Sequence, residues 1–276
     1  MKILIIDGNE KAASDRYTKL GMQTQYEVYK TVLEDISEIK LDIFTIHPAC
    51  SDNFLSKGLN IEDFDGIVWT GSVLNIYEKK PSIDRQIELA KVLLNKKNKI
   101  FGSCWGLQVL ATAAGGKVRK NPKGLEAIIA KDIKLNHEGI SHPMYKNKPL
   151  EFNAFCWHYD EIETLPNETK VLSSNNRSEV QSFCFNKEKS EVWAVQYHPE
   201  FNPKWMSGLM FQRKKLLFDE NIFTSEEKFV KLYDYLSNIE NNNLLKSELE
   251  ISDSLVDNKI HTIELSNWIN HVKNNI

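Results

Sequence analysis

Residues 99–108 read KIFGSCWGLQ, and this stretch decides the fold that the sequence predicts. Its apolar start is typical of a buried strand. The segment 105–114 is helix-prone and ends at Gly115-Gly116, a good C-terminal stop for a helix. Cys104 therefore stands at a strand-to-helix junction between two glycines, in the Gly-x-nucleophile-x-Gly pattern of a nucleophile elbow.

Short apolar strands alternate with amphipathic helices on the N-terminal side of this stretch. The expected strands cover 2–7, 41–46 and 66–70, and the expected helices cover 22–36 and 82–96. Strands that alternate with helices of this length form βαβ units, in which neighbouring strands run parallel. The sequence therefore predicts an α/β fold with an open, mainly parallel sheet flanked by helices.

The C-terminal side of the chain has a different pattern. From about 117 to 200 it is strand-like with little helix, and after Pro203 it becomes helical again. The sequence Thr-Ser-Glu-Glu at 224–227 predicts a capping box at the start of one helix. A polar stretch at 241–243 precedes a last helix at 263–272.

These patterns predict two parts, an α/β domain over 1–202 and a helical extension over 203–276. We expect the apolar faces of the extension to pack back on the same domain, which is the common fate of such helices. A docking surface for a partner protein is the alternative.

Composition narrows the class of protein. The chain has 276 residues, 41% of them hydrophobic and 26% charged, which is ordinary for a globular protein and excludes global disorder. The net charge of −3, without a Lys/Arg cluster, gives no support for nucleic-acid binding. The apolar run at the N-terminus is too short for a signal peptide or a membrane span, and no later stretch is long enough, so we expect a cytoplasmic protein.

The four cysteines, Cys50, Cys104, Cys156 and Cys184, form no Cys-x-x-Cys pair, so free thiols are expected. Cys156 and His158 are a single pair without the spacing of a zinc site, and no metal is predicted.

The local chemistry around Cys104 favours a reactive thiol. Gly102 and Gly106 let the backbone turn tightly enough to hold the side chain in a strained, exposed position. The N-terminus of the following helix is expected to lower the thiol pKa and stabilise the thiolate. The backbone N–H of Trp105 would point to where an oxyanion forms. The alternative is a core cysteine, because free cysteines are commonly buried.

A second motif, VQYHPE at 195–200, supplies a possible base. His198 and Glu200 are two residues apart at the end of a strand, so their side chains should share a face. A carboxylate there can orient an imidazole through one ring nitrogen and leave the other to exchange a proton with Cys104. A lone histidine is more often structural, but this pair downstream of an elbow predicts a Cys-His-Glu triad.

GSCWGLQ at 102–108 and QYHPE at 196–200 together resemble the class I, triad-type glutamine amidotransferases. The chain is especially similar to the glutaminase domain of GMP synthase and its stand-alone relatives, over roughly residues 1–201. The resemblance implies their flavodoxin-like fold. It also implies that Cys104 is the nucleophile, His198 the general base and acid, and Glu200 the group that orients His198.

The resemblance extends to the oxyanion hole and the substrate's amino-acid end. Thr-Gly-Ser at 70–72 falls where the family has a glycine-rich turn, which makes the Gly71 and Trp105 N–H groups the oxyanion donors. Gln108 matches a position that holds the amino-acid end of the substrate. The alternatives are a simple strand-ending turn for Gly71 and a solvated polar side chain for Gln108.

Trp-His-Tyr-Asp at 157–160 falls where relatives often read Ser-His-Gly-Asp, in the segment that closes over bound glutamine. His158 and Tyr159 are therefore predicted substrate contacts, although tyrosine in place of glycine leaves the pocket's shape open. His158 with Asp160 is the rival dyad for Cys104.

The activity implied is hydrolysis of the glutamine side-chain amide through a Cys104 thioester, releasing glutamate and ammonia without a metal or organic cofactor. Residues 203–276 lack the Ser-Gly-Gly-x-Asp-Ser loop of GMP synthase's second domain and are too few to form it. The sequence does not identify the ammonia acceptor, for which a separate synthetase protein is one candidate. The alternatives are a γ-glutamyl peptide or γ-glutamyl amide hydrolase with the same triad, and a non-catalytic regulatory homologue.

Overall fold

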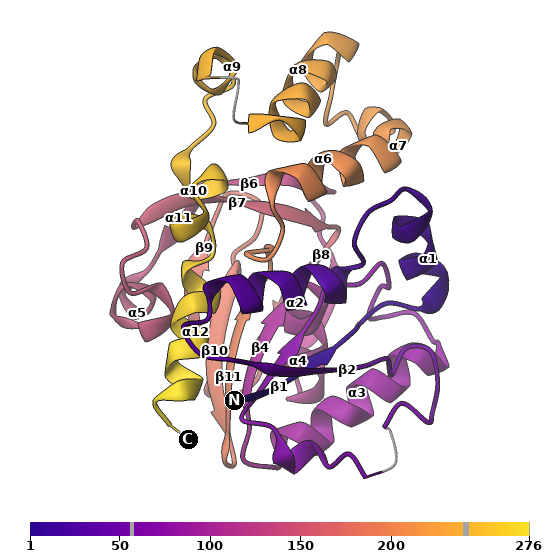
Figure 1. Ribbon diagram of the computed structural model, residues 1–276, viewed down its shortest axis with the longest axis vertical. Coiled ribbons are helices and arrows are strands. Elements are labelled where there is room, and N and C mark those ends of the chain that lie inside the picture. Colours follow the sequence, from indigo (N-terminus) through magenta and orange to yellow (C-terminus); the bar gives the residue numbers. More distant parts are fainter. Residues whose placement is uncertain (56–57, 240–242, 276) are drawn as a thin grey trace.

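A nine-stranded sheet runs through the middle of the molecule in the order β2-β1-β3-β4-β11-β10-β9-β6-β7 (Figure 1). The computed structural model describes residues 1–55, 58–239 and 243–275; residues 241–242 of the polar stretch lie outside them. The strands of this sheet are β1 (Lys2–Ile6), β2 (Asp42–Ile46), β3 (Gly66–Trp69), β4 (Lys99–Ser103), β6 (Glu126–Leu135), β7 (Glu151–His158), β9 (Lys170–Ser174), β10 (Ser182–Lys187) and β11 (Ser190–Val195). A separate pair joins β5 (Lys117–Lys120) to β8 (Asp160–Thr164).

Helices cover both faces of the sheet and one of its ends. They are α1 (Lys11–Lys19), α2 (Gln25–Ile36), α3 (Pro81–Leu94), α4 (Trp105–Ala113), α5 (His137–Ser141), α6 (Pro203–Gln212), α7 (Lys214–Asp219), α8 (Glu226–Ser237), α9 (Asn243–Glu248), α10 (Asp253–Val256), α11 (Asn258–His261) and α12 (Ile263–Lys273). Two 3-10 turns, η1 (Ile61–Asp63) and η2 (Pro143–Tyr145), complete the elements. In the part of the chain that the structure describes, no helix is long and apolar enough to cross a bilayer.

The predicted α/β fold with an open, mainly parallel sheet is confirmed. Strands β2, β1, β3, β4 and β11 run parallel; α1 and α2 connect β1 to β2, and α3 connects β3 to β4. Strands β10, β9, β6 and β7 add antiparallel pairs at one edge. These come from the helix-poor region, where strands are joined by turns and neighbours therefore run in opposite directions.

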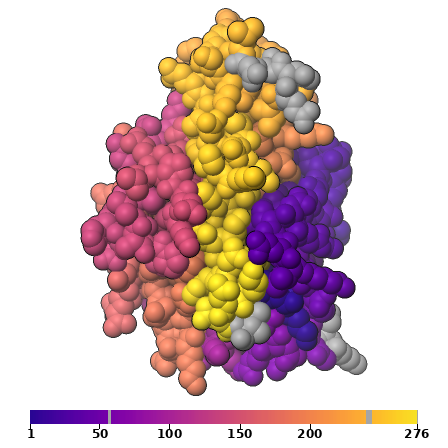
Figure 2. Space-filling view, turned by 60° about the vertical axis from the view of Figure 1, so that its left-hand side comes forward, coloured from indigo at the N-terminus to yellow at the C-terminus, as the bar shows by residue number. Residues whose placement is uncertain are grey.

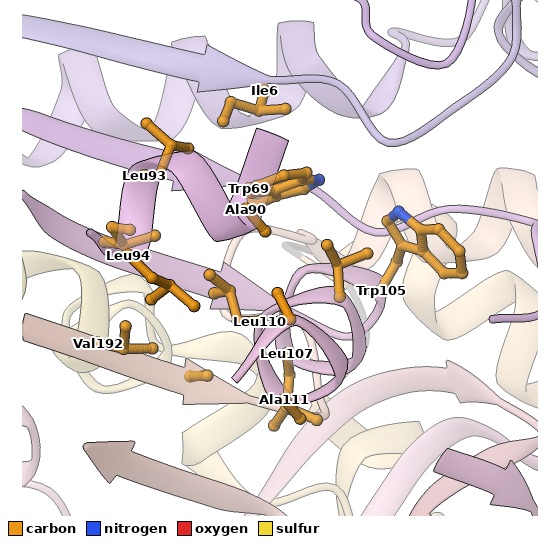
Figure 3. Packing of buried hydrophobic residues seen from close by; sticks show 14 of the residues in the cluster. Ile6, Trp69, Ala90, Leu93, Leu94, Trp105, Leu107, Leu110, Ala111 and Val192 are labelled. Atoms are coloured by element: carbon orange, nitrogen blue, oxygen red, sulfur yellow. The ribbon is translucent and has the colours of Figure 1, made fainter. Parts of the chain in front are cut away.

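Side-chain alternation along β1 divides the core between the two faces. Leu4 and Ile6 pack against α3 and α4 on one face, as Figure 3 shows for Ile6 with Trp69 and the leucines of these helices. Ile3 and Ile5 face α2 and α12 on the other. Fully burying a side chain of this size contributes about 1.5–3 kcal/mol, so both faces anchor the strand that starts the sheet.

The C-terminal helices pack on the same body as the sheet. In α12, the Trp268 ring lies 6.1 Å from the Phe101 ring, and a Cβ added to Gly66 would come within 2.9 Å of the indole. A buried ion pair of 2.9 Å joins Lys148 to Glu264 at the start of the helix. Figure 2 shows the C-terminal chain seated between the N-terminal segment and the middle of the sequence.

Helices α6 and α8 form a third apolar cluster, over the edge of the sheet that β6 and β7 make. The predicted capping box at 224–227 is wrong in one respect, because α8 begins at Glu226 and its N-cap is Ser225, whose Oγ accepts from the Lys228 N–H at 3.4 Å. A complete capping box occurs instead at α2, between Thr24 and Glu27.

Candidate active site

Cys104 occupies the turn between β4 and α4, where the carboxyl ends of the parallel strands meet. Its backbone has φ 49° and ψ −98°, a conformation that residues with side chains rarely adopt. The Cys104 N–H donates to the Val195 carbonyl at 2.8 Å and ties the turn to β11. A Cβ on Gly102 would lie 2.8 Å from the Gly106 backbone, and one on Gly106 would lie 2.6 Å from the Trp69 carbonyl. The tight turn therefore requires both glycines.

The imidazole of His198 is held by a carboxylate and an aromatic ring. His198 Nδ1 lies 2.6 Å from Glu200 Oε1, and Ser103 Oγ donates to Glu200 Oε2 at 3.1 Å. Phe201 stacks on the imidazole at 3.9 Å between ring centroids. All of these groups are buried, so the orientation of the ring is fixed.

His198 and Glu200 do pair, but the expectation that they share one face of a strand is wrong. Strand β11 ends at Val195, and His198 and Glu200 lie in the turn that follows it. Their side chains meet because the chain folds back through Pro199, with the His198 N–H bonded to the Phe155 carbonyl at 2.8 Å. Strand alternation does not apply to them.

Cys104 is buried, and its pKa is raised rather than lowered. Burial is the main cause, followed by the negative charges of Glu200 and Asp160. The Trp105 backbone N–H and the Gln196 side chain oppose this with smaller effects. The expectations of an exposed side chain and a stabilised thiolate are both wrong, because desolvation outweighs the helix N-terminus. A nucleophilic role then requires proton transfer from the thiol when substrate binds.

Cys104 and His198 face one small cavity of about 110 Å³. Its wall comes from six regions: α1 and α2, the loop after β3, the start of α4, the segment around the β7–β8 junction, the turn after β11, and the helices α6 and α7. The lining residues are Tyr17, Gln25, Ser72, Val73, Leu74, Asn75, Cys104, Trp105, Gln108, Trp157, His158, Tyr159, Asp160, His198, Phe201, Leu209, Arg213 and Leu216.

Gly71 lies against the imidazole. A Cβ at this position would come within 2.7 Å of His198 Cε1 and within 2.7 Å of Gln25 Oε1. Trp105 follows Cys104 in the chain and donates its indole N–H to Gln86 at 2.8 Å, which fixes the first turn of α4. Of the predicted oxyanion donors, Gly71 thus lies beside His198 and Trp105 is the chain neighbour of Cys104, and their role stays a prediction.

Gln108 and Tyr159 both line the cavity. Gln108 is buried, so it is not the solvated residue of the alternative interpretation. The Tyr159 hydroxyl donates to Glu220 at 3.0 Å and so reaches across to the residue that follows α7. Tyrosine here therefore joins the cavity wall to the C-terminal helices, as glycine could not.

The rival dyad of His158 and Asp160 does not form. His158 Nε2 pairs with Glu126 at 2.9 Å, and Nδ1 lies 3.0 Å from the Asp160 backbone carbonyl, not from its carboxylate. Both nitrogens of this buried ring are engaged by the protein. His158 is therefore placed to shape the cavity wall, and a direct substrate contact stays a prediction.

Gln25, Asp160 and Arg213 are among the polar lining residues that the sequence did not single out as binding groups. Gln25 Oε1 is buried and has no hydrogen-bond partner among the residues described. Asp160 accepts from the Tyr77 hydroxyl at 3.1 Å, and burial raises its pKa to about 6. The Thr24–Glu27 capping box could have placed Gln25 at a helix start, whereas no motif marks Arg213.

The sequence matches the family Glutamine amidotransferase class-I over residues 16–216, more than half of the chain. This protein belongs to that family. The resemblance of the two motifs to class I glutamine amidotransferases is confirmed.

Among curated relatives, the chain is 28% identical to a γ-glutamyl-L-1-hydroxyisopropylamide hydrolase of Pseudomonas sp., over 99% of this chain and 93% of the relative. It is 28% identical to γ-glutamyl peptidase 4 of Arabidopsis thaliana over 64% of this chain and 68% of the relative. Identity to a glutamine-hydrolysing GMP synthase subunit of Methanococcus vannielii is 33%, over 44% of this chain and 60% of the relative.

A crystal structure of a glutamine amidotransferase from Thermotoga maritima superposes with a TM-score of 0.65 and 16% identity, covering 99% of this chain and 97% of that one. At this identity the similarity establishes the fold alone.

Proposed function

We propose that this protein is a γ-glutamyl hydrolase, which cleaves the side-chain amide bond of γ-glutamyl amides or γ-glutamyl peptides. The observation that carries the proposal is the extent of the match to the Pseudomonas hydrolase, which takes in 99% of this chain and hence its C-terminal helices. Those helices supply Leu209, Arg213 and Leu216 to the cavity that holds Cys104. The C-terminal helices, which lie beyond the two motifs, thus line the Cys104 cavity and are also covered by the match to the Pseudomonas hydrolase.

Cys104, His198 and Glu200 carry the chemistry in this proposal. His198 takes the thiol proton as Cys104 Sγ attacks the γ-carbonyl carbon, and the carbonyl electron pair moves onto oxygen. The Gly71 and Trp105 N–H groups donate to this oxyanion. The C–N bond then breaks, and His198 gives its proton to the departing amine.

Deacylation follows the same path with water in place of the thiol. His198 removes a proton from water, which attacks the glutamyl thioester; the C–S bond breaks and glutamate leaves as the thiol regains its proton. Glu200, 2.6 Å from Nδ1, supports the positive charge on the imidazole in both steps. This order suits a thiol that burial keeps protonated before substrate arrives.

The polar groups of the cavity fit the amino-acid end of a γ-glutamyl substrate. The Asp160 carboxylate and the free Gln25 Oε1 can accept from its α-ammonium group, and Gln108 can bind its α-carboxylate. All three are buried, so these hydrogen bonds would form away from competing water.

A glutaminase that supplies ammonia to a separate synthetase is the second candidate, supported by the similarity to the Methanococcus GMP synthase protein. The two candidates differ only in the leaving group. Ammonia needs no binding wall, whereas a substituted amine gains from contact with Leu209 and Leu216, at about 1–3 kcal/mol for each methylene-sized contact.

The test compares the kcat/KM values of γ-glutamylisopropylamide, γ-glutamylglycine and glutamine. We expect at least one substituted amide to exceed glutamine by about 10-fold or more. Cys104→Ser should lower kcat by about 10⁴-fold or more, whereas Cys50→Ser, at an exposed thiol, should retain full activity. Glutamine as the preferred substrate would favour the second candidate, and an active Cys104→Ser protein would rule out both.

A further inference from the structure

Arg213 reaches the cavity from the C-terminal extension. It occupies the junction between α6, which ends at Gln212, and α7, which begins at Lys214. Its neighbours on the cavity wall are Leu209, one turn earlier, and Leu216, one turn later. The wall is therefore apolar on both sides of a single guanidinium group.

The helix that carries Arg213 is packed firmly. Phe201 and Trp205 stack at 3.9 Å between ring centroids, and Trp205 contacts the Tyr17 ring at 5.4 Å. A Cβ on Gly208 would come within 2.8 Å of Met22 Sδ, so α6 lies close against the connection between α1 and α2. The direction from which Arg213 approaches the cavity is thus set by buried contacts.

Arg213 is the permanently charged cation among the residues described as lining the cavity. Within the described residues, no ion pair joins it to a carboxylate, although other surface cations of α7 and α8 have such partners. Glu220, near the same rim, is engaged by the Tyr159 hydroxyl. Asp160 supplies a negative charge on another wall of the cavity. The cavity therefore presents one cation and one anion from different elements.

We propose that Arg213 binds a carboxylate of the γ-glutamyl substrate. This inference rests on the proposed function. A guanidinium group presents a planar fork of donors that matches a carboxylate, and such charge-assisted pairs are about twice as strong as neutral hydrogen bonds. The carboxylate has two possible sources: the α-carboxylate of the glutamyl unit and that of an amino acid in the leaving group.

Substrates with and without a carboxylate on the leaving side separate the two sources. Arg213→Gln is assayed with γ-glutamylglycine, which has both carboxylates, and with γ-glutamylisopropylamide, which has only the glutamyl one. Loss on γ-glutamylglycine alone assigns Arg213 to the leaving group, and equal loss on both assigns it to the glutamyl unit. We expect KM to rise about 10-fold or more with kcat nearly unchanged, and Arg213→Lys to recover part of the loss.

Lys215→Gln is the matched control, because it removes a cation from the same helix turn at an exposed position. It should leave both KM values unchanged. Wild-type KM values for both substrates in Arg213→Gln, within about twofold, would overturn the assignment.

Binding measured without turnover separates this inference from the proposed function. In the Cys104→Ala background, titration calorimetry with γ-glutamylglycine gives the Kd with and without the Arg213→Gln change. A Kd that is about 10-fold weaker supports the carboxylate contact even if the wild-type protein were to prefer another substrate. An unchanged Kd contradicts it whatever the activity.

Discussion

Cys104 has an unusual backbone conformation, which contacts of the surrounding turn stabilise. A side chain at φ 49° and ψ −98° costs on the order of 1–3 kcal/mol. The bond from its N–H to Val195 and the glycine contacts at Gly102 and Gly106 keep the turn in place. The thiol is consequently fixed at the carboxyl edge of the sheet, in the wall of the cavity that His198 also lines, and burial there raises its pKa.

At the same scale, Asp160 gives the protein a pH dependence. Its folded pKa of about 6 lies above the ordinary value of 3.8, so the protonated form is favoured by folding. The stability that this proton contributes is complete below about pH 4 and is lost as the pH rises through 6. Above pH 6 the ionised Asp160 carboxylate therefore costs stability, and in the proposed function this is the form that binds the substrate's ammonium group.

Asp160→Asn is expected to raise the free energy of unfolding at pH 7.5 by about 1–3 kcal/mol, from a shift of about two pKa units. At pH 4 the gain should vanish. The KM of wild-type enzyme should rise as the pH falls below 6, and that of Asp160→Asn should be high and independent of pH there. Urea unfolding and initial rates between pH 4 and 8 check this prediction. If Asp160→Asn and the wild-type protein had the same free energy of unfolding at pH 7.5 as well as at pH 4, the prediction would be contradicted.

At the residue scale, the sequence predicted those candidate site residues that lie in short motifs. Cys104, His198 and Glu200 lie in two short stretches whose chemistry is local. The states of these groups were not predictable, because the thiol pKa depends on burial beneath distant segments. Gln25 and Arg213 reach the cavity only through the packing of α2 and α6.

At the scale of elements, the loop after β3 positions the imidazole that follows β11. Gly71 has no room for a Cβ because His198 Cε1 would lie 2.7 Å from it. Gly71→Ala should therefore displace the imidazole and lower kcat by about 100-fold, with a small effect on the unfolding midpoint.

Lys79→Ala is the control for this prediction, because it alters an exposed residue of the same loop that does not line the cavity. Stopped-flow or steady-state rates with a γ-glutamyl amide provide the measurement. Normal kcat in Gly71→Ala would mean that the close contact with His198 has no catalytic consequence.

The order of elements was largely readable from periodicity, since strands 2–7, 66–70 and the helices at 82–96 and 263–272 correspond to β1, β3, α3 and α12. α1 was missed because it is short and strongly polar. The pairing of β6 with β7 and β9 could not be derived, because it depends on contacts between residues far apart in sequence.

At the scale of the whole molecule, the C-terminal chain closes the core that the N-terminal strands begin. Trp268 is buried against Phe101 and Gly66, on the face opposite α3 and α4. Trp268→Ala should lower the free energy of unfolding by about 3–5 kcal/mol. Leu244→Ala, at a side chain 90% exposed, should change it by less than about 0.5 kcal/mol. Urea unfolding of both variants tests this, and similar values for the two would show that α12 is only loosely attached.

The extension also reaches the cavity, so the two parts expected from the sequence share one site. The sequence did not predict this shared site. An amphipathic pattern indicates that one face of a helix is buried, but it does not indicate which element packs on that face. The match to a γ-glutamyl amide hydrolase covers almost the whole chain, and the cavity wall is likewise built from both parts of the chain.

The most direct measurement of the central claim is the mass of the enzyme during turnover. Protein mixed with a γ-glutamyl amide and quenched in acid should gain the mass of one γ-glutamyl group, and peptide mapping should locate it on Cys104. The adduct should disappear on treatment with hydroxylamine and be absent from Cys104→Ser. A γ-glutamyl adduct at another residue, or full hydrolytic activity in Cys104→Ser, would contradict the thioester mechanism.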